Sequence, residues 1–241
     1  MKHLATLLWV CWLASQGVAR AQGGGAPVGW LKLSTEVSLR NHWGLYSEVE
    51  SRQGNAQLGA QRLGRVGFRL HVAPCFSLTT GYVLAANEFD RADASTAPEH
   101  RFYQDIALTD QSGPVRASHR LRAEERWLRP TPEAAFRFAP RLRYQLRLVI
   151  PLRTAGQLPV GGTYVVVADE LFAGLGPHTG RSFLEENRIS GGLGYRLNTR
   201  TSFEMAYLHQ SQWAPLSGWV RNALQLSVAV ALPNQVALAR Q

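Results

Sequence analysis

The sequence has few cysteines and lacks the short motifs that hold metals. Cys11 and Cys75 are the only cysteines in 241 residues, and Cys11 lies in an N-terminal segment that we expect to be removed. The mature chain would keep one cysteine and form no intramolecular disulfide. No CxxC or HExxH motif occurs, and no two histidines stand at metal-ligand spacing. We therefore expect neither a metal nor another cofactor.

Long apolar runs are also missing, which excludes helical membrane spans. The apolar segment Leu4 to Ala14 is too short, since a spanning helix needs about 20 residues. It follows a short polar start and precedes the small-x-small pattern Ala19-Arg20-Ala21. These features are typical of a secretory signal peptide that is cleaved after Ala21. A retained signal anchor is the alternative, but we expect cleavage and an exported chain.

Lysine is nearly absent, although the chain is basic. Lys2 and Lys32 are the only lysines among 26 basic residues, and the formal net charge is +9. One explanation is the codon bias of a GC-rich genome, and another is that a planar guanidinium group can hold two carboxylates in a crowded interior. The arginines are spread along extended runs and are not clustered on a helix or tail, and export separates the chain from nucleic acid. We expect no nucleic-acid partner.

The sequence is rich in strict alternation of polar and apolar residues, most clearly in the runs 118–127 and 141–150. Each run predicts a strand with one apolar and one charged face. The charged faces carry Arg120, Arg122, Glu124 and Arg126 in the first run and Arg141, Arg143, Gln145 and Arg147 in the second. The polar face of a soluble sandwich usually carries mixed, short side chains. A ladder of arginine and glutamate favours an inside-out arrangement, with apolar faces toward lipid and charged faces toward the lumen of a barrel.

Eleven such runs of near ten residues are separated alternately by short turns and longer loops. Aromatic residues, Trp30 and Trp43 among them, stand at run ends, as interface girdles do. We predict an all-β fold, a single antiparallel up-and-down β-barrel of the transmembrane outer-membrane type. Bacterial single-chain barrels have even strand numbers. Either one weak strand lies before Trp30 or in Glu133 to Ala139, or two of the runs fuse, and we expect about 12 strands.

The expected domain organisation follows from these boundaries. Residues 1–21 are the signal peptide, 22–29 an N-terminal linker, 30–232 the barrel and 233–241 a C-terminal tail. Within the barrel, we expect a long loop at Glu88 to Glu99 and a turn at Asp110 to Pro114.

Five motifs, taken in order, resemble those of a known bacterial family. They are HRLRAEER at 119–126, RLRY at 141–144, ADELF at 168–172, ENRISGGLGY at 186–195 and AYLHQ at 206–210. They are similar to a family known only as a domain of unknown function and described as probable outer-membrane or exported β-barrel proteins. The resemblance spans Trp30 to about Leu232, and Glu125 departs from it where a glutamine is expected. It implies a barrel in the outer membrane of a Gram-negative cell, but no activity and no catalytic residue.

The inward arginines need carboxylate partners, because an unpaired buried guanidinium costs several kcal/mol. The carboxylates that could supply them are Glu36, Glu48, Glu50, Glu99, Asp105, Glu124, Glu170, Glu186 and Glu204. We predict a charge network in the lumen formed by Arg120, Arg122, Glu124, Arg126, Arg141, Arg143, Arg147, Glu170, Arg188 and Glu204.

Two functions of this network stay open. In a structural barrel, the network would close the lumen and set the strand register. In a narrow channel or porin-like passage, part of it would stay hydrated and pass small polar or anionic solutes, since rings of arginine favour anions. The expected partners are outer-membrane lipid and, for a channel, such a solute. We expect a monomer.

Two further alternatives remain. An outer-membrane lipid-modifying enzyme is the least supported, because Ser118 and His119 are neighbours that point to opposite faces of a strand. His209 and Ser211 share a face, but Glu204 is too far along the strand to orient the histidine. We therefore assign no catalytic residue. A soluble periplasmic ligand-binding β-barrel is the other alternative, and it predicts that the apolar faces point inward.

Overall fold

The structure is a computed structural model that describes residues 27–39, 42–54, 59–88, 96–129, 131, 133–153, 158–176, 183–213 and 218–233. The predicted signal peptide lies outside these described residues, and so do most of the predicted linker and most of the predicted tail.

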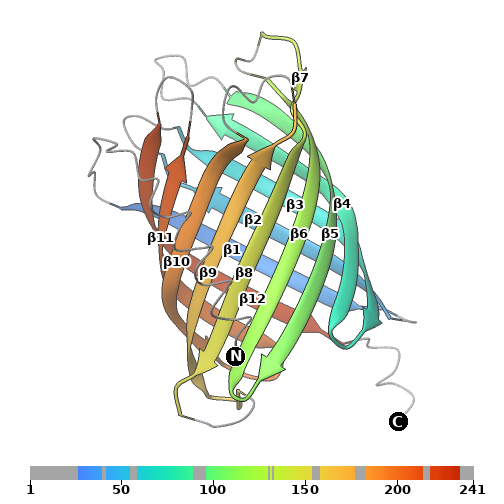
Figure 1. Cartoon of the computed structure of the whole chain (residues 1–241), viewed down its shortest axis with the longest axis vertical. Helices are drawn as coiled ribbons and strands as arrows, with labels where there is room; N and C mark the ends of the chain where they lie inside the picture. The colour runs from blue at the N-terminus through green and yellow to red at the C-terminus, as the bar shows by residue number, and fades with distance from the viewer. Residues whose placement is uncertain are drawn as a thin grey trace.

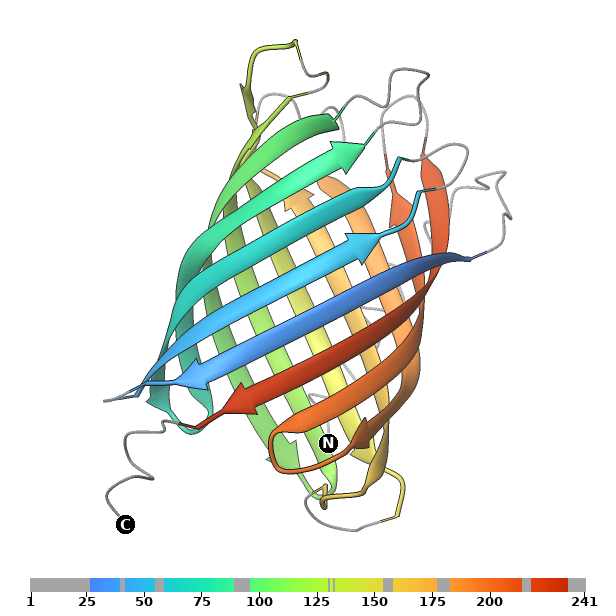
Figure 2. The same cartoon turned by 180° about the vertical axis from the view of Figure 1, so that it is seen from behind.

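Most of the described residues are in strands, and eleven of the strands form one closed barrel (Figures 1 and 2). The barrel strands are β1 (Val28–Ser38), β2 (Trp43–Arg52), β3 (Gln61–Ala73), β4 (Phe76–Glu88), β5 (Thr96–Ser112), β6 (Val115–Leu128), β8 (Arg141–Pro151), β9 (Thr163–Gly174), β10 (Leu184–Arg196), β11 (Thr201–Gln212) and β12 (Trp219–Leu232). A short strand, β7 (Arg137–Phe138), pairs only with β6. No helix among these residues is long and apolar enough to cross a membrane.

The predicted all-β barrel of about 12 strands is confirmed, with one refinement of its closure. Eleven strands close the barrel and β7 is an extra strand, which lies in the range Glu133 to Ala139 where we expected a weak one. Because the chain reverses at each connection, an odd number of strands leaves the first and last pointing the same way. Accordingly β1 and β12 pair in parallel, whereas the other barrel pairs are antiparallel. The even strand number is therefore not met within the closed sheet.

The connections differ between the two ends of the barrel. Two residues join β3 to β4 and β5 to β6 at one end, termed the short-turn end; the opposite end is termed the long-loop end. The loop expected at Glu88 to Glu99 and the turn expected at Asp110 to Pro114 are both shorter in the structure. Residues 96–99 and 110–112 belong to β5. The reason is that inward polar residues such as Glu99, which is buried, make a barrel strand look like a loop in the sequence.

Apolar side chains cover the outside of the barrel. They alternate along the strands with buried charged residues; Val49, for example, is 63% exposed between the buried Glu48 and Glu50. The exposed apolar residues include Leu31, Leu33, Val66, Phe68, Leu84, Phe102, Ile106, Leu121, Val167, Leu193, Met205, Leu224 and Leu226. The apolar residues of these strands therefore face outward and the arginines face inward.

Trp30 does not belong to an interface girdle, contrary to expectation. It is only 1% exposed and shares the inward face of β1 with Lys32. The guanidinium groups of Arg52 and Arg188 lie 4.5 and 5.3 Å from the centre of its ring. Its position at a run end suggested the girdle, but the period-two pattern places it in the lumen.

Two facing glycines let a tyrosine fill the lumen beside β3 and β4. Gly67 and Gly81 are partners in the register, and a Cβ added to Gly81 would lie 2.2 Å from the carbonyl oxygen of Val66 and 2.7 Å from the hydroxyl of Tyr103. Tyr103 is fully buried against this glycine pair. A side chain at position 81 must therefore push either the strand or the ring away.

We expect Gly81→Ala to lower the free energy of unfolding by about 1–3 kcal/mol, because it overpacks this site. Gly64→Ala is the matched control, since an added Cβ at Gly64 meets no atom within 4 Å. Denaturant unfolding of both variants in detergent micelles measures the difference. Equal stabilities of the two variants would contradict the packing account.

Candidate functional site

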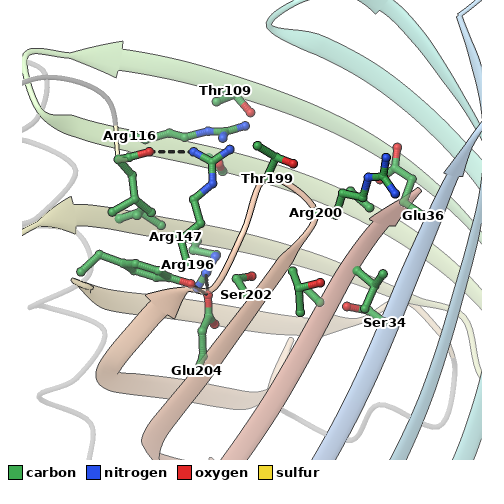
Figure 3. Close-up of a pocket in the computed structure, with 18 of the residues that line it drawn as sticks. Ser34, Glu36, Thr109, Arg116, Arg147, Arg196, Thr199, Arg200, Ser202 and Glu204 are labelled. Atoms are coloured by element: carbon green, nitrogen blue, oxygen red, sulfur yellow. Dashed lines mark hydrogen bonds and ion pairs between the residues drawn. The ribbon is translucent and has the colours of Figure 1, made fainter. Parts of the chain in front are cut away.

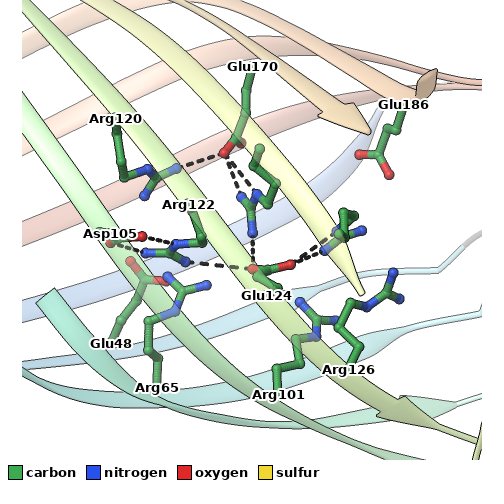
Figure 4. Close-up of polar contacts among 12 residues, drawn as sticks. Glu48, Arg65, Arg101, Asp105, Arg120, Arg122, Glu124, Arg126, Glu170 and Glu186 are labelled. Carbon is green, nitrogen blue, oxygen red and sulfur yellow. Dashed lines mark hydrogen bonds and ion pairs between the residues drawn. The ribbon is translucent and has the colours of Figure 1, made fainter. Parts of the chain in front are cut away.

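Closure of the sheet brings the charged faces of the strands into the lumen, where Glu124 on β6 lies at the centre of a network (Figure 4). The Nη2 atom of Arg141 and the Nη1 atom of Arg143 each donate to its carboxylate at 2.6 Å. Arg143 also donates to Glu170 on β9 at 2.7 Å. One planar guanidinium group thus holds two carboxylates, which a lysine cannot do with the same geometry.

The network continues to the neighbouring strands. Arg120 donates to Glu170 at 2.7 Å. The Nε and Nη2 atoms of Arg122 donate hydrogen bonds to the carboxylate of Asp105 on β5, at 2.5 and 2.7 Å. The Nη1 atom of Arg122 lies 3.9 Å from Glu124. These paired contacts join β5, β6, β8 and β9 from the inside. A slip of one residue would turn them outward, so the network also fixes the register.

Further ion pairs line the rest of the lumen. Lys32 lies 3.1 Å from Glu48, which also accepts a hydrogen bond from Arg65. Glu99 accepts from Arg101 at 2.9 Å and from Arg126 at 2.6 Å. Taking a carboxylate out of water is costly, and two cationic partners offset part of that cost. Each of these two buried carboxylates is therefore matched by two cations.

All ten residues of the predicted charge network face the lumen, but they form four groups rather than one. Arg120, Arg122, Glu124, Arg141, Arg143 and Glu170 are joined in one group, Arg126 pairs with Glu99, Arg188 with Glu186, and Arg147 with Glu204. Each of the nine candidate carboxylates has a cationic partner.

Sequence reasoning did not place five further cations that pair with these carboxylates: Lys32, Arg52, Arg65, Arg69 and Arg101. The signal was present, because the same period-two pattern places them on the charged faces of their runs.

Two aromatic rings support the guanidinium groups. The guanidinium carbons of Arg141 and Arg143 lie 4.9 and 4.6 Å from the ring centre of Phe172, and that of Arg122 lies 4.3 Å from the ring centre of Tyr103. Guanidinium groups are weakly hydrated and stack on such faces. The rings therefore fill space between charges that water would otherwise occupy.

The open space in the lumen is uneven. A cavity of about 110 Å³ lies among the ion pairs, lined by Arg120, Arg143 and Glu170. A much larger cavity of about 1050 Å³, termed the vestibule, is bounded by residues of the short-turn end, including Pro74, Thr199 and Arg200 (Figure 3). The lumen is thus wide at the short-turn end and filled by ion pairs beyond the vestibule.

The vestibule carries more arginine than carboxylate. Its wall includes Arg116, Arg147, Arg196 and Arg200, and Glu36, Asp110 and Glu204 are its acidic residues (Figure 3). The Nη1 atom of Arg196 donates to the carbonyl of Leu158 at 2.6 Å. The tyrosine hydroxyl of Tyr164 donates to Glu204 at 2.8 Å. Among the described residues, Arg116 and Arg200 have no carboxylate partner.

Within the described part of the chain, no group of three or more histidine, cysteine, aspartate and glutamate residues could hold a metal ion.

Comparison with protein families adds one match. The family model described as "Protein of unknown function (DUF2490)" matches residues 28–220. The chain belongs to this family. The match begins at the first residue of β1 and ends at the second residue of β12, so it covers β1 to β11 and the ten residues of the predicted charge network. The predicted resemblance to a family of unknown function is confirmed, and DUF2490 assigns no role to any residue. No match was found among curated proteins.

Proposed function

We propose that the protein is a β-barrel of the outer membrane, with strands that cross the bilayer and a lumen closed by its charge network. The observation that carries this proposal is the apolar outer wall. A soluble protein rarely exposes contiguous apolar patches larger than a few hundred Å², and larger ones mark contact with a membrane or a partner. Barrel strands of 10 to 17 residues are also long enough, since about 9–11 residues cross a bilayer.

The soluble periplasmic alternative is less well supported. A soluble barrel that binds an apolar ligand would direct its apolar faces inward. Here the lumen holds Glu124 and Arg122, both almost fully buried, while Leu33 and Val49 are exposed outside. In lipid this arrangement costs little, because the backbone is paired around the closed sheet.

The side chains that fill the middle of the barrel support a closed lumen. Arg143 bridges Glu124 and Glu170 across β6, β8 and β9, and Phe172 fills the space beside it. The remaining cavity of about 110 Å³ holds only a few water molecules. The network therefore supports a structural, non-conducting barrel.

A second function is supported by the vestibule. Arg116 and Arg200 line it and lack a carboxylate partner among the described residues. Arginine in such a position attracts anions. Binding or slow passage of a small anionic solute is therefore the alternative function.

Planar-bilayer recordings distinguish the two functions. We expect the wild type to show no conductance steps, and Arg143→Ser/Glu170→Ser to produce them, because the double variant removes the ion pair that fills the lumen without changing its net charge. The matched control is Arg147→Ser/Glu204→Ser, which removes an ion pair of the vestibule wall and should leave the lumen closed. Anion-selective steps from the wild type would contradict the closed lumen and favour the passage.

A further inference from the structure

The apolar outer wall carries several polar groups, such as the His119–Tyr144 and Tyr82–His100 pairs, and one of them lies near the long-loop end of β11 and β12. Along β11, Phe203, Met205 and Tyr207 are exposed on the outside, and His209 and Ser211 continue the same face. Asn222 faces His209 in the register of β11 and β12. Polar side chains on a lipid-facing wall are costly and rare, so this group needs an explanation.

The three side chains form a chain of hydrogen bonds. The Oγ atom of Ser211 lies 3.2 Å from Nε2 of His209, and Nδ1 of His209 lies 2.9 Å from Oδ1 of Asn222. A carbonyl oxygen only accepts hydrogen bonds, so Nδ1 carries the proton and donates to Asn222. Nε2 is then left with a lone pair that accepts the proton of Ser211. A nucleophile, a base and a group that orients the base are arranged as in serine hydrolases.

We propose that Ser211, His209 and Asn222 form a catalytic triad that hydrolyses acyl esters of membrane lipids; this inference rests on the membrane placement proposed above. Oγ of Ser211 attacks the ester carbonyl carbon while Nε2 of His209 takes its proton. The ester C–O bond then breaks, and His209 returns the proton to the departing alkoxide, which leaves as the alcohol of a lysolipid. Water, activated by the same imidazole, cleaves the acyl-serine and releases a fatty acid.

The surroundings identify the substrate class. Ser211 is the second-last residue of β11, so it lies near the edge of the apolar wall, where lipid headgroups begin in a membrane-spanning barrel. From there toward the middle of the barrel, the outer face presents Tyr207, Met205 and Leu224, all exposed. An acyl chain can lie along this apolar wall while its ester stays at the level of Ser211. The polar vestibule offers no such surface.

Ser211 is only 9% exposed. Its hydrogen bond to His209 is therefore shielded from water. The attraction between polar groups is stronger in such a water-excluded site.

The test uses the full chain in phosphatidylethanolamine vesicles and in detergent, with a fluorophosphonate probe for reactive serines. We expect labelling of Ser211 and release of fatty acid, and Ser211→Ala should abolish the labelling and slow the release by about 10³-fold or more. Ser51→Ala is the matched control, because Ser51 is a serine on the outer face of β2 near the same end of the barrel. This control should keep full labelling at Ser211 and full hydrolysis.

Asn222 is a positioning residue, and its test differs accordingly. Asn222→Leu should lower kcat by roughly 10- to 100-fold with KM unchanged, less than loss of the nucleophile, because the asparagine only orients the imidazole. Asn222→Asp should restore most of kcat, since a carboxylate accepts the same hydrogen bond from Nδ1. A merely structural role would not be rescued in this way.

Two results would overturn the triad. One is folded wild-type protein that neither reacts with the probe nor releases fatty acid, and the other is hydrolysis that persists in Ser211→Ala. Failure of the membrane placement looks different: the chain would fractionate as a soluble protein and could still react with the probe at Ser211.

Discussion

Replacing Glu124 with leucine should lower the free energy of unfolding by about 3–5 kcal/mol, the typical cost of breaking a buried ion pair from one side. Glu124 is the sole carboxylate that accepts from Arg141 in the described lumen, so the substitution leaves a buried guanidinium group uncompensated. Arg143 is less affected, because it keeps its bond to Glu170. Denaturant unfolding in detergent micelles measures the loss.

Two further variants make this result specific. Replacing Arg141 as well, in Glu124→Leu/Arg141→Leu, also removes the unpaired guanidinium group. This double variant should recover most of the lost stability, because an apolar pair can replace a buried ion pair. Glu88→Gln breaks the exposed pair with Arg62, whose side chains are 33% and 70% exposed, and should cost about 0–1 kcal/mol. Similar losses in Glu124→Leu and Glu88→Gln would contradict a dry, paired lumen.

Leu33→Arg should destabilise the barrel in lipid by about 2–4 kcal/mol, the cost of an arginine on the lipid face near the bilayer midplane. Leu33 is the sixth of the eleven residues of β1, is 49% exposed, and pairs with the equally outward Val49. Its side chain therefore lies on the part of the wall farthest from both ends of the strand. Urea unfolding in lipid vesicles, together with the yield of membrane assembly, measures the effect.

The neighbouring position supplies the matched control. Ser34 lies on the opposite face of the same strand and lines the vestibule of about 1050 Å³, so Ser34→Arg has room and water. It should be tolerated with less than about 1 kcal/mol of destabilisation, as surface substitutions usually are. If Ser34→Arg blocked assembly and Leu33→Arg did not, the assignment of the two faces would be reversed.

The barrel and its charge network were largely predictable, because both depend on the period-two pattern within single strands. The alternation in 141–150 is enough by itself to place Arg141, Arg143 and Arg147 on one face. Strand ends were less predictable, since Glu99 and Asp110 are polar residues within β5 and have the composition of a loop. Trp30 shows a different error. Its position at the end of a run suggested an interface girdle, although the period-two pattern places it on the same inward face as Lys32.

The hydrogen-bonded group on the outer wall was only half predictable. The two-residue spacing of His209 and Ser211 places them on one face from sequence alone. Asn222 was missed because its place opposite His209 depends on the register of β11 and β12, and hence on the geometry of the connection between them. A search for a partner along β11 reached only Glu204, which faces the lumen and pairs with Arg147.

Cell fractionation with a heat-modifiability gel tests the central claim most directly. The chain is expressed in a Gram-negative host, the outer membrane is separated from the periplasm, and the protein is run with and without boiling. We expect it in the outer-membrane fraction and expect the unboiled protein to migrate faster, because a closed barrel stays folded in the detergent of the gel. Recovery as a soluble periplasmic protein would contradict the assignment of the apolar wall to lipid.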